Sequence, residues 1–128
     1  MRAYLPIGHS GLEAFLAQGS IQLTQIYAAT PIFLDENSEC DEEEIEYLLA
    51  IRAGEAALEL RTSLSSPGLV LAIDLEEAQC GENYEEMITV LGPVSWSQVA
   101  CALLAQEGAD ELAWFATQEI APELDSWK

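Results

Sequence analysis

Residues 41–75 read DEEEIEYLLAIRAGEAALELRTSLSSPGLVLAIDL and predict one long helix followed by one buried strand. The helix begins with a capping-box pattern, Asp41 with Glu44, in a first turn whose acidic residues suit the helix dipole. Residues 65–68 end the helix, and residues 69–75 form a nearly continuous apolar run that is typical of a buried strand. Apolar residues at three- and four-residue spacing predict one buried helix face, formed by Ile45, Leu48, Leu49, Ala53, Ala56, Leu60 and Leu64.

On the N-terminal side of this stretch the pattern predicts a strand, a helix and a second strand. Residues 3–7 are a short apolar run and predict the first strand. Residues 11–18 have helical spacing, and Gly19 is a typical helix stop. Residues 24–30 predict the second strand, which ends at Pro31.

On the C-terminal side one segment stays open between helix and strand. Residues 88–91 predict a strand that follows an acidic, polar loop. Residues 95–107 begin with a capping pattern and continue at helical spacing, but residues 99–105 within them are also an unbroken apolar run that suits a strand. Residues 112–120 are rich in aromatic side chains and predict a final strand, and residues 121–128 form a tail.

This order of elements predicts a single α+β domain over residues 1–128. We expect a two-layer sandwich, with a mixed sheet of about five strands and helices mainly on one face. Half of the 128 residues are apolar. A chain of this length buries about two thirds of its unfolded surface, which is enough for one core.

The charge balance excludes several classes of partner. The chain has 23 Asp and Glu against 4 Lys and Arg, which gives a formal net charge of −19. Binding to nucleic acid or to an anionic membrane requires clustered basic residues, so neither is expected. The three cysteines contain no Cys-x-x-Cys pair and fit a reducing compartment. No apolar run reaches the roughly 20 residues that span a bilayer, and we expect a cytoplasmic protein.

The acidic run before the long helix has the ligand spacing of a calcium-binding loop. The match fails where Cys40 stands in place of the glycine that the sharp turn requires. The sequence therefore favours a surface loop followed by an acidic first helical turn, and no metal site is assigned. The candidate oxygen ligands are Asp35, Asn37, Glu39, Asp41, Glu43 and Glu46.

Five further residues are candidates for a site. His9 is the only histidine, and Asp74 ends an apolar strand, so the two are candidates for a pocket in which a carboxylate serves as acid or base. Trp114 and Phe115 are adjacent on a predicted strand and must point to opposite faces, so one of them is a candidate for an interface. Trp127 lies in the tail and is a candidate for a docked or swapped terminus. No catalytic set and no cofactor motif is found.

Six short segments, in order over nearly the whole chain, are similar to segments of one family: residues 1–6 (MRAYLP), 29–31 (ATP), 43–47 (EEIEY), 71–74 (LAID), 92–94 (GPV) and 114–119 (WFATQE). The last of these is the most distinctive. The chain thus resembles an uncharacterised family of small acidic proteins from actinobacteria, known as a domain of unknown function. Because no catalytic residues are assigned in that family, the resemblance implies none here.

These observations favour a non-enzymatic cytoplasmic domain that works by protein–protein contact. The partner is either a second copy of the chain, in a homodimer, or a basic protein attracted by the acidic surface. The alternative is a domain that binds a small ligand or a divalent cation, or an enzyme that uses carboxylates near a pocket. A concave pocket with convergent polar groups favours the alternative, and an exposed aromatic patch with an acidic rim favours the interaction domain.

Overall fold

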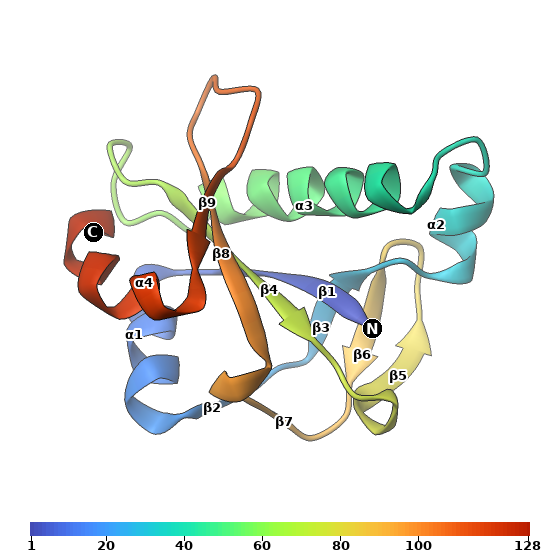
Figure 1. Cartoon of the computed structure of the whole chain (residues 1–128), viewed down its shortest axis with the longest axis horizontal. Helices are drawn as coiled ribbons and strands as arrows, with labels where there is room; N and C mark the ends of the chain where they lie inside the picture. Colours follow the sequence, from blue (N-terminus) through green and yellow to red (C-terminus); the bar gives the residue numbers. More distant parts are fainter.

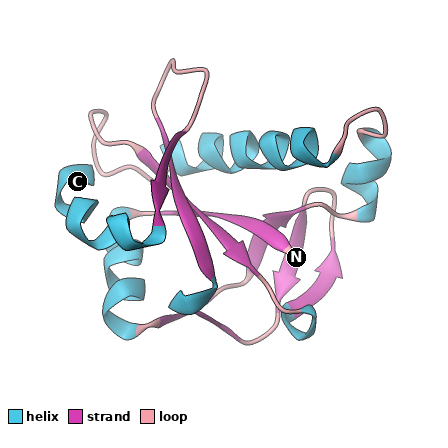
Figure 2. Cartoon of the chain, in the orientation of Figure 1, coloured by secondary structure: helices cyan, strands magenta, loops and turns pink.

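The computed structural model describes all residues 1–128. Its main sheet has seven strands, and Figures 1 and 2 show how the helices lie around this sheet. The strand order is β5-β6-β3-β1-β4-β8-β9. Two short strands, β2 (Ser20–Gln22) and β7 (Pro93–Ser95), pair separately. The strands of the main sheet are β1 (Arg2–Ile7), β3 (Gln25–Ala28), β4 (Gly68–Asp74), β5 (Cys80–Asn83), β6 (Met87–Val90), β8 (Val99–Ala105) and β9 (Ala113–Ala116).

Helices cover both faces of this sheet. In Figure 1, α3 lies along one side, while α1 and α4 lie on the other. The α-helices are α1 (His9–Gln18), α2 (Pro31–Glu36), α3 (Glu42–Leu58) and α4 (Thr117–Glu123), and the 3₁₀ turns are η1 (Glu77–Gln79), η2 (Trp96–Gln98) and η3 (Leu124–Trp127).

The architecture corrects three details of the expected sandwich. The α+β class is confirmed, but every strand pair is antiparallel, so the sheet is not mixed. Its seven strands exceed the expected five, because short polar strands such as β5 carry no apolar alternation. The expectation that helices lie mainly on one face was also wrong. The central strands are apolar on both sides, so helices pack against both faces of the sheet.

The paired strands β1 and β4 divide the interior into two cores. Leu5 faces Leu71 in the register of this pair, and both belong to the larger core beneath α1, α4 and η3. Tyr4 faces Ala72, and both belong to the smaller core beneath α3. Alternation along a strand sends neighbouring residues to opposite faces, so one buried strand serves both cores.

Helix α3 starts as predicted and ends earlier. The Asp41 side chain accepts a hydrogen bond from the backbone N–H of Glu44 at 2.9 Å, which confirms the capping box. The helix stops at Leu58 rather than near residue 64, because the guanidinium of Arg61 donates to the carbonyls of Leu58 and Leu64 in the turn that follows. Leu64 is 85% exposed and contributes nothing to the core.

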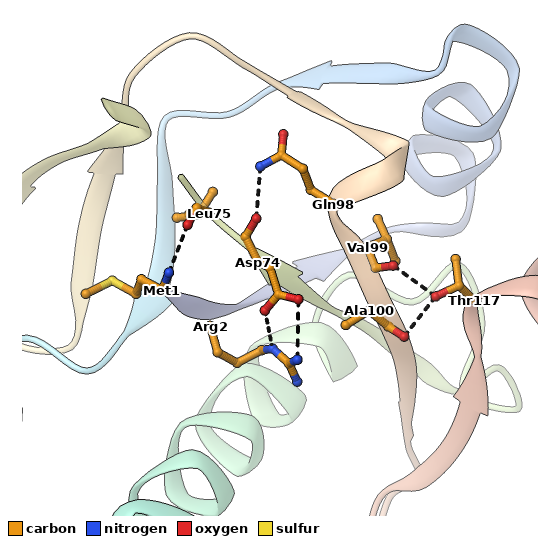
Figure 3. Close-up of polar contacts among 8 residues, drawn as sticks. All are labelled: Met1, Arg2, Asp74, Leu75, Gln98, Val99, Ala100 and Thr117. Carbon is orange, nitrogen blue, oxygen red and sulfur yellow. Dashed lines mark hydrogen bonds and ion pairs between the residues drawn. The ribbon is translucent and has the colours of Figure 1, made fainter. Parts of the chain in front are cut away.

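The ambiguous segment is a strand, β8, that follows the short turn η2. Ala72 pairs with Cys101 and Ile73 with Val99, so Ala100 is an extra residue in a β-bulge. The hydroxyl of Thr117 donates to the carbonyls of Val99 and Ala100, at 2.9 and 2.8 Å, and holds this bulge (Figure 3).

Two expectations about the C-terminal part of the chain were wrong. The predicted final strand over residues 112–120 stops at Ala116, where the Glu119 carboxylate accepts the backbone N–H and α4 begins. The predicted tail over residues 121–128 is helical, continuing through α4 and η3. The helix α2 was missed, although Thr30 caps it and Pro31 occupies its first turn.

Candidate functional site

His9 and Asp74 do not share a pocket. His9 follows the end of β1 at which Ile7 pairs with Leu69, and Asp74 pairs with Arg2 at the other end of the same strands. Five residues of strand at about 3.3 Å each separate the two ends by roughly 17 Å. The expected pocket is therefore absent, because the antiparallel register places its two members at opposite edges of the fold.

His9 holds the C-terminal segment. Its Nε2 lies 2.8 Å from the carbonyl oxygen of Leu124 and donates to it. The cavity between His9 and Trp127 has a volume of about 10 Å³, which is no larger than the space that one water occupies. This histidine connects α1 to η3 and has no room for a ligand.

Asp74 is part of an exposed ion pair at the start of β1 (Figure 3). Arg2 Nε and Nη2 donate to its two carboxylate oxygens, at 2.7 and 3.4 Å. This contact raises the pKa of the Arg2 guanidinium. The Gln98 amide donates to the Asp74 carbonyl, and the Met1 amine donates to the Leu75 carbonyl. Asp74, at the end of β4, is therefore bonded to β1 through Arg2 and to η2 through Gln98.

The candidate calcium ligands are taken up by two helices. Asp35 lies within α2, and the amide of Asn37 donates to the Phe33 carbonyl at its end. Asp41 caps α3, and Glu46 lies in its second turn. No group of three or more His, Cys, Asp or Glu side chains converges on one point in the structure. Glu39 and Glu43, the other two candidate ligands, are exposed.

The three candidate interface aromatics lie in different surroundings. Trp114 on β9 is 61% exposed. Phe115 points to the opposite face, where its ring meets that of Trp127 edge-on with centroids 5.1 Å apart. Trp127 is 4% exposed, within the larger core. Trp127 is thus docked in its own chain and is removed from the candidate interface, because Phe115 and His9 retain its segment.

The largest concavity is a groove of about 430 Å³ between α2, the first half of α3 and the start of β1. Its floor and walls are mainly apolar, and three carboxylates with Arg2 stand at its edge. We call it the α2–α3 groove. Met1 and Leu34 are 51% and 45% exposed at its mouth. Its residues are Met1, Arg2, Ala29, Leu34, Cys40, Asp41, Glu42, Ile45, Glu46 and Leu49.

Three carboxylates at the groove form no ion pair. All four basic side chains of the protein are already paired, Arg2 with Asp74 and the others elsewhere: Arg52 with Glu86, Arg61 with Glu107 and Lys128 with Asp125. Asp41, Glu42 and Glu46 at the groove have no such partner. Burial raises the pKa of Tyr4 to about 12, and the charge of Glu46 adds to the effect.

The cysteine of the groove is not an activated thiol. Burial and the neighbouring carboxylates of Glu44, Glu39 and Asp41 raise the pKa of Cys40. The thiolate is the nucleophile and the metal ligand, so a raised pKa keeps this side chain in its unreactive form. The groove therefore offers apolar contact and negative charge rather than covalent chemistry.

Sequence reasoning found the acids of this groove but not the groove. Asp41 and Glu46 are among the candidate metal ligands that the sequence indicates, whereas no predicted helix includes Leu34. The signal that would have found it is Thr30 followed by Pro31, which is a typical helix start. A helix there brings Leu34 toward α3 and forms the missing wall.

An acidic α+β domain with an apolar groove is the class that fold and site define. Residues 1–110 match the model of a family of unknown function, DUF6912, and the chain belongs to this family. The α2–α3 groove lies wholly within the matched residues. Neither the curated proteins nor the solved structures contain a match. No helix is long and apolar enough to cross a membrane.

Proposed function

We propose that this protein is a non-enzymatic binding module of the cytoplasm whose α2–α3 groove takes a basic segment of a partner protein. One apolar side chain of that segment enters the groove, and flanking Lys or Arg residues face its acidic rim. The observation that carries the proposal is the combination of an apolar groove of about 430 Å³ with rim carboxylates that form no ion pair within the chain.

The apolar part of the proposal rests on exposed side chains. Met1 and Leu34 leave about half of their surface in water at the groove mouth. An incoming apolar side chain removes that surface from water together with its own, and burial of one Leu-sized group contributes about 1.5–3 kcal/mol. The cavity beside His9 has about the volume of one water and is too small for a ligand.

The basic character of the partner follows from charge complementarity. Asp41, Glu42 and Glu46 border the groove within a molecule of net charge −19. Such a field accelerates encounter with a cationic segment and repels anionic ones. It also opposes the homodimer, because two copies of the same negative charge repel each other.

The test uses two labelled lysine-rich peptides of about ten residues, one with a central Leu and one with Ser in its place. We expect the Leu peptide to bind about tenfold more tightly in fluorescence anisotropy at about 0.15 M salt, as burial of one Leu predicts. Leu34→Ser should abolish this difference, and Glu46→Gln should weaken both peptides. The matched controls are Leu64→Ser and Glu13→Gln, which lie outside the groove and should leave both affinities unchanged.

Equal effects of the groove variants and their controls contradict the proposal. That result means that the peptides bind the whole acidic surface diffusely, as the net charge alone allows. Urea unfolding of each variant confirms that a change in affinity is not a loss of fold. Because Leu34 and Leu64 are both exposed, neither replacement removes a core residue.

A further inference from the structure

A second groove, of about 310 Å³, lies between α3 and the hairpin loop that joins β8 to β9. Figure 1 shows this loop rising beside α3. We call the concavity the α3–hairpin groove. Its apolar residues are Leu48, Ile51, Gly54 and Leu58 from α3 and Ala105, Ala109 and Leu112 from the hairpin, and its polar ones are Tyr47, Glu55, Gln106, Asp110 and Glu111.

Two polar contacts hold the hairpin loop beside α3. The hydroxyl of Tyr47 donates to the carbonyl of Asp110 at 3.3 Å, and Arg61 pairs with Glu107 at 3.4 Å. The floor is closed at Gly54, where a Cβ would lie 3.1 Å from Cδ2 of Leu112. Tyr47 is 53% exposed at the mouth. The groove is thus preformed, tight at its floor and open to solvent.

The charge of this groove matches that of the first. Glu55, Asp110 and Glu111 border it, and none of the three has an ion-pair partner. An apolar floor with unpaired carboxylates at its edge selects an apolar side chain flanked by cationic ones. A basic partner segment therefore fits both grooves by the same chemistry.

The two grooves share helix α3 and no lining residue. On α3, the first is lined between Glu42 and Leu49 and the second between Tyr47 and Leu58. Their centres are about seven residues apart on the helix, which is roughly 10 Å at 1.5 Å per residue. At 3.6 residues per turn, the α3 residues that line the first groove and those that line the second lie on opposite sides of the helix. A bound segment must therefore pass around a helix about 10–12 Å wide, which adds roughly 16–19 Å of arc to the distance along the axis. This path requires about six to eight extended residues.

The second groove combines residues inside and outside the family match. All of its α3 residues lie within residues 1–110, whereas Glu111 and Leu112 lie beyond them. Of the hairpin wall, Ala105, Gln106, Ala109 and Asp110 also lie within the match, so only the end of this wall is outside the family model. A partner that also contacts this wall must have a second apolar side chain, in addition to the one that enters the first groove.

We infer that the α3–hairpin groove binds a second apolar side chain of the same basic segment, so that the partner is selected by two apolar residues about six to eight positions apart. This inference rests on the proposed function of the α2–α3 groove. Two linked contacts bind more tightly than either alone only when the linker fits their separation. Selection by spacing is therefore the property to measure.

The experiment uses lysine-rich peptides of constant charge with two Leu residues, separated by about two, five, eight or eleven positions. We expect the spacing near eight to bind about tenfold or more tighter than the single-Leu peptide, and the shortest spacing to show no gain. The variant Ala109→Trp adds a bulky side chain to the exposed edge of the groove. It should remove the gain of the second Leu, whereas Leu34→Ser should weaken binding of the single-Leu peptide.

The control variant Ala17→Trp places the same side chain on the exposed surface of α1, and it should preserve the gain. A gain that survives Ala109→Trp, or no gain at any spacing, overturns the inference. In that case the proposed function still stands if Leu34→Ser weakens the single-Leu peptide. If Leu34→Ser has no effect, the proposed function itself fails.

A separate measurement tests whether the groove binds a second copy of the chain. If sedimentation shows self-association that Ala109→Trp abolishes, the groove binds a second copy, and the inference is also overturned.

Discussion

Two tryptophans of this protein have opposite roles. Trp127 lies in the larger core, with its ring against Phe115, while Trp114 stands on the outer face of the edge strand β9. The difference follows from the end of the chain, where α4 and η3 return to cover α1 and the β8 side of the sheet. A residue near a terminus is thus as deeply buried as one in a central strand.

This difference predicts unequal losses of stability. Trp127→Ala should lower the free energy of unfolding by about 3–5 kcal/mol, as is usual for a large aromatic residue removed from a core. Trp114→Ala should lower it by less than about 1 kcal/mol, because the side chain is mostly exposed. Urea unfolding followed by circular dichroism measures both. Similar losses in the two variants would show that the C-terminal segment does not depend on Trp127 for its docking.

Tyr4 predicts a specific loss of stability at high pH. Its pKa of about 12 in the folded protein exceeds the ordinary value of about 10. The unfolded chain therefore releases this proton first, so stability is complete below pH 10 and falls as the pH rises toward 12. We expect Tyr4→Phe to reduce the fall between about pH 9 and pH 11 by roughly 1 kcal/mol. Guanidinium unfolding at each pH measures it, and an unchanged slope in the variant would contradict the assignment.

At the scale of elements, α3 carries both the fold and the candidate sites. Its inner face covers the smaller core, and its two halves line separate grooves. Asp41 connects these roles, because it caps the helix and also borders the α2–α3 groove. Substitution of this residue must therefore separate capping from charge.

Two replacements of Asp41 make that separation. Asp41→Ala should lower the free energy of unfolding by about 1 kcal/mol through loss of the cap. Asp41→Asn should change it by only a few tenths, because Asn caps a helix about as well as Asp. Peptide binding in the α2–α3 groove should weaken in both variants, since both lose the charge. If Asn destabilises the protein as much as Ala, the helix dipole rather than the cap governs this position.

Elements with a clear period were predictable, and those without one were not. The capping box and apolar spacing located the start of α3, and the apolar run of β4 located that strand. The strands β2, β5 and β7 have three or four residues each, too few for a periodic pattern. Residues 112–120 look like a strand because of Trp114 and Phe115, but the side chain of Glu119 accepts the N–H of Ala116 and starts a helix.

At the scale of the whole molecule, the grooves could not be predicted because they join distant segments. Met1, Leu34 and Glu46 line one groove from three separate elements. Tyr47 and Asp110 meet across the other through the β8–β9 hairpin. The sequence establishes the excess of acids, whereas the antiparallel order of β1, β4 and β8 decides which apolar residues lie beside them.

The charge of −19 makes salt a stabiliser of this fold. Each of the four ion pairs has at least one exposed side chain and contributes little, so their loss in salt is small beside the relief of repulsion among unpaired carboxylates. Sodium chloride shortens the screening length from about 30 Å at 0.01 M to 3 Å at 1 M. We expect the thermal midpoint to rise by about 4–8 °C over this range, equivalent to a gain of roughly 1–2 kcal/mol in the free energy of unfolding.

Potassium chloride should raise the midpoint equally, because screening depends on ionic strength and not on the cation. A midpoint that falls with salt would mean that the few ion pairs outweigh the repulsion, and a rise with micromolar calcium alone would point to a specific cation site.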